Sequence, residues 1–255
     1  MVNISDATVD LPAGKVFYRD AGGAGVPVVC LHAASGNSML WEHQIPAFTE
    51  AGLRFIAIDH RAAARGSNSS ALIDGLLTRL KLNRCHILGT AAGGGAALQF
   101  ALEQPQRLRS LVVANSIGYV VDRDYAELGN RIRPVPQFNE LPLDFRELGP
   151  SYRATEPAGV ARWLALSGKR QASAGAKVVA GNNEEVTWAK LEGLKIPTLL
   201  LTGDADLYTP PSVLRMFTAR MPHAESAVIP ETGHSSYWES PEVFNRTVLD
   251  FLARQ

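Results

Sequence analysis

The 255-residue sequence has few of the features that mark membrane or nucleic-acid-binding proteins. Its 25 lysine and arginine residues are balanced by 25 aspartate and glutamate residues, so charge favours neither a nucleic acid nor a membrane surface as partner. No run approaches the ~20 uninterrupted apolar residues that a membrane-spanning helix needs, and the first residues lack the pattern of a secretory signal. We therefore expect a cytoplasmic protein, a monomer or homodimer, that acts on a small molecule.

Cysteine is nearly absent as well. Cys30 and Cys85 are the two cysteines, and both fall in runs typical of buried strands. They lack the C-x-x-C spacing of metal and redox sites, so we interpret them as small core residues in a reducing compartment. We expect the protein to use neither a metal ion nor an organic cofactor.

What the sequence does contain is an alternation of short apolar runs with helical patterns. This alternation predicts a mainly parallel, doubly wound α/β sheet. The expected strands are residues 15–20, 26–31, 55–58, a run from residue 85, 108–114, 198–201 and 226–229. The expected helices are residues 41–51, 71–82, 96–102, 213–221 and 243–252.

The pattern changes between residues 118 and 194. Five prolines interrupt this stretch, its aromatic residues are scattered, and no buried strand is visible. The helical spacing of Val160, Trp163, Leu164 and Leu166 favours an ordered helical insertion over a disordered excursion. We therefore predict a core of residues 1–117 and 195–255, with residues 118–194 forming a cap over the strand ends.

The run from residue 85 leads into a glycine-rich turn and then into small residues. A strand, the pattern Gly-x-nucleophile-x-Gly and a helix together form a nucleophile elbow, the sharp turn that presents a serine. Gly89 and Gly93 occupy the two glycine positions, so the nucleophile position falls on Ala91. Alanine has no nucleophilic atom.

Two further motifs follow the elbow, each after a buried strand. Residues 203–211 (GDADLYTPP) resemble an acid motif, and residues 231–239 (ETGHSSYWE) resemble a histidine motif. With the elbow, they make nearly the whole chain resemble the α/β-hydrolase superfamily, in particular its small single-cap lactonases, carboxylesterases and C–C bond hydrolases. The resemblance implies Asp206 as catalytic acid and His234 as base. Asp204 is the alternative acid, which the spacing to Thr209 disfavours.

The resemblance also implies an oxyanion hole and a substrate pocket. The backbone N–H of Ala92 would form the hole with that of Ala34, in a loop that has His32-Ala33 where the family usually has His-Gly. The candidate pocket residues are His32, Ser35, Thr90, Ser116, Trp163 and Trp238. Thr90 and Ser116 are poor replacements for the nucleophile, and His86, inside a core strand, is better interpreted as structural.

Two explanations account for Ala91: a serine replaced by mutation, or a natural alanine. The second is favoured because other motifs differ too, including residues 61–67 where the family usually has Arg-Gly-x-Gly-x-Ser. A His–Asp dyad without serine could activate water for hydrolysis, abstract a proton in a lyase or isomerase, or serve a cofactor-free oxygenase. A binding protein without catalysis is disfavoured, because it has no need of a carboxylate behind a histidine.

Overall fold

The structure is a computed structural model, and it describes residues 2–59, 69–116, 118–167 and 185–255. His60, the segment 61–67 and part of the predicted cap, residues 168–184, lie outside the described residues.

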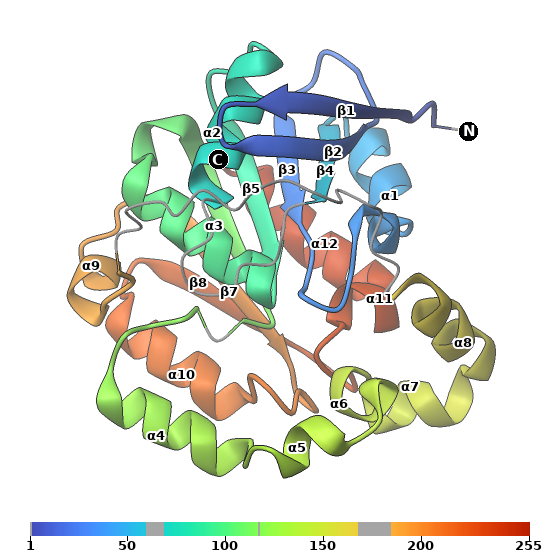
Figure 1. Ribbon diagram of the computed structural model, residues 1–255, viewed down its shortest axis with the longest axis vertical. Helices are drawn as coiled ribbons and strands as arrows, with labels where there is room; N and C mark the ends of the chain where they lie inside the picture. Colours follow the sequence, from blue (N-terminus) through green and yellow to red (C-terminus); the bar gives the residue numbers. More distant parts are fainter. Residues whose placement is uncertain (1, 60–68, 117, 168–184) are drawn as a thin grey trace.

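An eight-stranded sheet lies at the centre of the protein (Figure 1). Its order is β1-β2-β4-β3-β5-β6-β7-β8. The pairs β1–β2 and β2–β4 are antiparallel, and every other neighbouring pair is parallel. The strands are β1 (Ser5–Leu11), β2 (Gly14–Asp20), β3 (Pro27–Leu31), β4 (Arg54–Asp59), β5 (Cys85–Thr90), β6 (Leu108–Ala114), β7 (Thr198–Gly203) and β8 (Ala224–Ile229).

Helices cover both faces of this sheet, as expected for a doubly wound fold. In β3, Val29 and Leu31 join one hydrophobic cluster while Val28 and Cys30 join the other, because successive side chains of a strand point to opposite faces. The first face is covered by α2 (Ser69–Arg79), α3 (Ala92–Glu103) and α10 (Pro211–Arg220), and the second by α1 (Gln44–Glu50), α11 (Ser236–Glu239) and α12 (Pro241–Leu252).

The described parts of the predicted cap contain helices and no strand. These helices are α4 (Arg123–Ile132), α5 (Gln137–Glu140), α6 (Leu143–Glu147), α7 (Pro150–Thr155), α8 (Pro157–Leu166) and α9 (Trp188–Glu192). Figure 1 shows α5 to α8 following one another along one side of the molecule, with α4 and α9 nearer to α10. The division into core and cap stays a prediction.

Three elements differ from the sequence-based expectation. The N-terminal strand β1 was not predicted; it is an edge strand whose residues are exposed or partly buried, so it lacks an apolar run. The helix expected at 41–51 is divided into a 3-10 turn, η1 (Ser38–Trp41), and α1. The helix expected at 96–102 begins at Ala92, so that it includes the three glycines before Ala96.

Both cysteines are buried and free, in agreement with their interpretation as core residues. Burial raises the pKa of both thiols, that of Cys85 to about 12. None of the described helices combines the length and the apolar character needed to cross a membrane.

Candidate active site

The turn between β5 and α3 has the strained geometry of a nucleophile elbow. Ala91 has φ 50° and ψ −115°, a conformation that residues other than glycine rarely adopt. The surrounding backbone fixes it: the Ala91 N–H donates to the Ala114 carbonyl at 2.9 Å, and the Gly94 N–H donates to the Ala91 carbonyl at 3.0 Å. The Ser116 hydroxyl donates to the same carbonyl at 2.6 Å. The elbow is thus kept although the residue at its apex is alanine.

Close packing explains why three consecutive glycines lie inside α3 and not before it. A Cβ atom on Gly93 would overlap the carbonyl oxygen of Leu31 at the end of β3, and one on Gly89 would overlap the Gly93 carbonyl. At the next two glycines, a Cβ would meet the side chains of Ser116 and Tyr119. The expectation that the helix starts only after the glycines was therefore wrong, because tertiary contacts outweigh their low helix propensity.

The two candidate oxyanion-hole residues lie on adjoining segments. Gly93 brings the first turn of α3 against the backbone of Leu31 and His32, so Ala92 lies beside the loop that follows β3. In that loop the Gly36 N–H donates to the Ala33 carbonyl at 2.9 Å. Ala34 is exposed at its tip and Ala92 is buried. This arrangement places two backbone segments next to the elbow, as an oxyanion hole requires.

The predicted acid and base face each other. Asp206 follows β7 and His234 follows β8, and the Nδ1 atom of His234 is 2.9 Å from both carboxylate oxygens of Asp206. Both residues are buried: Asp206 is 2% exposed and His234 is 5% exposed. Asp204, the alternative acid, is exposed, so the geometry favours Asp206.

Hydrogen bonds surround the Asp206 carboxylate. The backbone N–H groups of Tyr208 and Thr209 donate to Oδ1 at 2.7 and 2.9 Å, and the Thr202 hydroxyl donates to Oδ2 at 3.1 Å. Burial alone would raise the pKa of Asp206, but the facing His234 and hydrogen bonds from the Thr209 N–H and the Asn115 side chain hold the pKa below its ordinary value. Asp206 is therefore a carboxylate at neutral pH.

The same pair sets the protonation of His234. Burial by itself lowers the pKa of the imidazole, but the charge and hydrogen bond of Asp206, with the charge of Glu147, raise the pKa above its ordinary value. An imidazole whose Nδ1 donates to a carboxylate has Nε2 free to accept a proton. The pair can therefore serve as a general base.

Asn115 joins the acid to the loop that carries His234, and the sequence analysis did not assign it a role. Its Nδ2 donates to Asp206 Oδ2 and to the Gly233 carbonyl, both at 3.1 Å, and its Oδ1 accepts from the Ser236 hydroxyl at 2.6 Å. It is fully buried with φ 48°. The sequence signal that could have identified Asn115 is its position as a polar residue directly after β6, the strand beside β7.

Two glutamates near His234 were also missed. Glu147, at the end of α6, is 6% exposed, and its Oε2 has no hydrogen-bond partner among the described residues. Glu239 accepts hydrogen bonds from the N–H groups of Gly149 and Gly233, at 2.6 and 3.0 Å, and thereby joins the α6–α7 junction to the His234 loop. No motif marks either glutamate in the sequence, because only the fold brings them to this site.

The structure separates the predicted pocket residues into two groups. Ser35 is partly exposed in the loop that follows β3, and His32 contacts the Ala33 carbonyl through Nδ1 at 2.7 Å. Ser116 supports the elbow backbone, and Thr90 is buried within its strand. Trp163 and Trp238 are 0% and 2% exposed within the second hydrophobic cluster, so they pack the interior and expose almost no surface to a pocket, a correction to the prediction.

His86 has the structural role that the sequence predicted. Its Nδ1 lies 2.8 Å from the Ser110 hydroxyl, and burial lowers its pKa to about 4.

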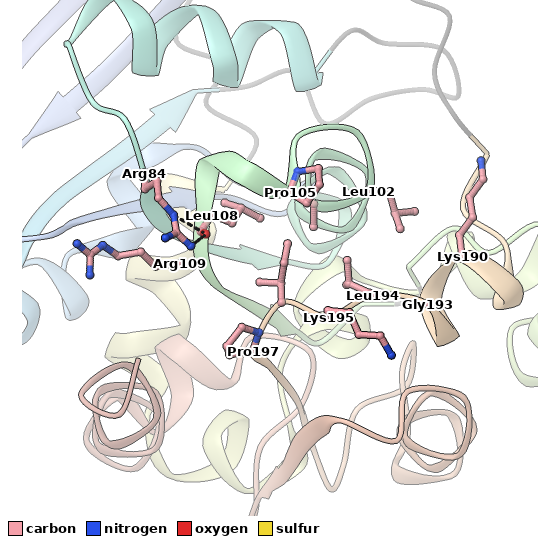
Figure 2. Close-up of a pocket in the computed structure, with 12 residues that line it drawn as sticks. Arg84, Leu102, Pro105, Leu108, Arg109, Lys190, Gly193, Leu194, Lys195 and Pro197 are labelled. Atoms are coloured by element: carbon pink, nitrogen blue, oxygen red, sulfur yellow. Dashed lines mark hydrogen bonds between the residues drawn. The ribbon is translucent and has the colours of Figure 1, made fainter.

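A cavity of about 530 Å³ lies at the amino-terminal ends of β6 and β7 (Figure 2). Arg84, Arg109, Lys190 and Lys195 contribute to its wall. Figure 2 shows Arg109 extending to the left and Lys190, on the other side of the view, extending upward, so these two cations do not converge on one point. The cavity is separate from the His234–Asp206 pair, because Asp206 and His234 follow the carboxyl ends of β7 and β8.

The elbow, the acid and the histidine, in this order along a doubly wound sheet, define an α/β-hydrolase. The chain belongs to the alpha/beta hydrolase fold family, whose model matches residues 26–241.

Among its relatives is a 2-hydroxy-6-oxononadienedioate/2-hydroxy-6-oxononatrienedioate hydrolase from Cupriavidus pinatubonensis, 26% identical over 93% of this chain and 90% of the relative. A 2-hydroxy-6-oxo-6-phenylhexa-2,4-dienoate hydrolase from Burkholderia cepacia is 26% identical over 94% and 91%. Among solved structures, a thermophilic esterase from Thermogutta terrifontis superposes with a TM-score of 0.76 at 20% identity, covering 98% of each chain.

Proposed function

We propose that the protein is a hydrolase of small carbonyl substrates, an ester, a lactone or a C–C bond beside a carbonyl, in which His234 activates water directly. The observation that carries the proposal is the buried His234–Asp206 pair beside an elbow whose apex is Ala91. The names of the two relatives, both hydrolases of oxo-dienoate compounds, support the reaction class.

The proposed reaction needs no covalent intermediate. Nε2 of His234 removes a proton from a water molecule as the water oxygen attacks the carbonyl carbon. The Ala34 and Ala92 N–H groups stabilise the charge that develops on the carbonyl oxygen, and Asp206 stabilises the imidazolium. When the tetrahedral intermediate collapses, the leaving group receives a proton and an acid is released.

The same base could instead abstract a proton from a substrate carbon. Ala91 supports this second candidate function, because an elbow without a nucleophile does not require hydrolysis. The protein would then be a lyase, an isomerase or a cofactor-free oxygenase. Release of an acid and an alcohol from an ester distinguishes hydrolysis from these reactions.

The proposal is tested by the hydrolysis of p-nitrophenyl butyrate. We expect His234→Ala to abolish turnover and Asp206→Asn to lower kcat by about 10⁴-fold, because the asparagine favours the wrong imidazole tautomer. His223→Ala is the matched control, since His223 is exposed and should leave the rate unchanged. A His234→Ala protein that retains the parent rate would exclude the proposed base.

A further inference from the structure

Two carboxyl groups besides Asp206 lie next to the His234 loop, and their surroundings differ. Glu239 is satisfied by backbone N–H groups of Gly149, Gly233 and Ser235. Glu147 is buried with Oε2 unpartnered among the described residues. Burying a polar atom without a partner costs free energy, so the unpartnered Oε2 of Glu147 needs an explanation that Glu239 does not.

The backbone fixes the end of α6 against the histidine loop. The Ser235 N–H donates to the Glu147 carbonyl at 3.0 Å. A Cβ atom on Gly233 would lie 2.5 Å from the Gly149 nitrogen and 3.1 Å from the Glu147 carbonyl oxygen, so the two segments are in direct contact. Glu147 is therefore held beside His234 by the path of the chain and not by a flexible side chain alone.

The Glu147 carboxyl lies among groups of the candidate active site. The pKa of Glu147 lies above its ordinary value, chiefly because the carboxyl is buried. The charge of Asp206 also raises this pKa, whereas the charges of His234 and Arg146 and a hydrogen bond from Ser35 lower it. The charge of Glu147 in turn raises the pKa values of Tyr208 and Tyr237. Its neighbours Ser35 and His234 come from the loops that follow β3 and β8, and burial favours the protonated acid, which can donate a proton.

We propose that Glu147 is the general acid of the reaction, the group that protonates the leaving group when the tetrahedral intermediate collapses. This inference rests on the proposed hydrolytic function. It assigns the two proton transfers to two residues: His234 takes a proton from water, and Glu147 gives its proton to the departing oxygen or carbon.

The protons balance over the cycle. Water adds to the carbonyl carbon and loses one proton to His234; the bond to the leaving group breaks and that group takes the Glu147 proton. The imidazolium of His234 then returns its proton to the Glu147 carboxylate. One water is consumed, both residues regain their starting states, and no other reactant is needed.

The leaving-group dependence of the Glu147→Gln variant tests this role. p-Nitrophenyl butyrate and ethyl butyrate share an acyl group, but only ethoxide needs to be protonated as it leaves. We expect Glu147→Gln to lower kcat/KM for ethyl butyrate by about 10²- to 10⁴-fold and to leave p-nitrophenyl butyrate near the parent value. Glu140→Gln, at an exposed carboxyl on α5, is the control and should change neither.

Equal losses on both esters would make Glu147 a structural residue and overturn the inference. A parent protein that hydrolyses the p-nitrophenyl ester but not the ethyl ester would also overturn it. Failure of the parent on both esters, by contrast, counts against the proposed function.

Discussion

The elbow has no hydroxyl at Ala91, yet the polar side chains of the candidate site keep their hydrogen-bond partners. Asp206 accepts hydrogen bonds from Asn115, Thr202 and His234, and Asn115 also binds the Gly233 carbonyl. A site that had lost its chemistry would have no reason to keep a buried carboxylate so fully hydrogen-bonded. The proposed base therefore keeps its partners although the apex of the elbow carries no hydroxyl.

Glu239 gives a pH-dependent test of the contact between the histidine loop and the α6–α7 junction. Burial raises the pKa of Glu239 from 4.5 to about 7, against the opposing hydrogen bonds from Gly233, Gly149 and Ser235. The folded protein then binds this proton more tightly than the unfolded chain, so its contribution to stability is present below about pH 4.5 and is lost as the pH rises to about 7.

We therefore expect the free energy of unfolding of Glu239→Gln, measured by urea denaturation, to decline less than that of the parent between these pH values. Glu140→Gln is the exposed control and should follow the parent. Parallel curves for Glu239→Gln and the parent would contradict the raised pKa.

Individual side chains could be predicted only where a local motif marked them. Asp206 and His234 each sit in a recognisable run after a buried strand, and the structure brings them together. Asn115 contacts Asp206 across 91 positions and Gly233 across 118, and Glu147 reaches His234 from the insertion, so no local pattern contained these contacts. Trp163 was assigned to the pocket from its aromatic character, but burial depends on the packing of α8.

The start of α3 is determined by how closely it approaches β3 and its loop. Alanine is favoured over glycine in a helix by about 1 kcal/mol, yet at position 93 its Cβ would overlap backbone atoms of Leu31 and His32. Backbone atoms cannot move aside cheaply, so the overlap should outweigh the propensity.

We expect Gly93→Ala to lower the free energy of unfolding by about 1–3 kcal/mol and to reduce esterase activity, because the loop bearing Ala34 is displaced. Denaturant unfolding and the p-nitrophenyl butyrate assay measure the two effects. Gly193→Ala is the matched control: its Cβ would come no closer than 3.5 Å to its neighbours, so stability should stay within about 0.5 kcal/mol. Equal stability of the two variants would contradict the close approach.

Elements with a strong apolar pattern were predicted well, and those without one were not. The buried parallel strands β3 to β7 are continuous apolar runs because both of their faces are covered. The edge strand β1 lacks such a run, and the short helices α5 to α7 are only four to six residues long, too short to show a helical period.

On the scale of the whole molecule, the candidate site lies at one end of the parallel strands. The elbow, Asn115, Asp206 and His234 all follow the carboxyl ends of parallel strands, where open α/β sheets bind their ligands. The alternation of strands and helices predicted the parallel sheet, and the acid and histidine motifs were each predicted to follow a buried strand. The alternation could not predict which residues of the insertion reach the candidate site. Glu147 reaches it because α6 packs against the loop that carries His234.

The central claim, that the site hydrolyses its substrate without a covalent intermediate, is tested by pre-steady-state kinetics and intact mass with p-nitrophenyl butyrate. The parent should show turnover without a burst and no gain of a butyryl group. Ala91→Ser should show a burst and a butyryl adduct, since the elbow then presents a hydroxyl to His234, and the Ala91→Ser/His234→Ala double variant should show neither. A burst or a butyryl adduct on the parent protein would contradict the claim.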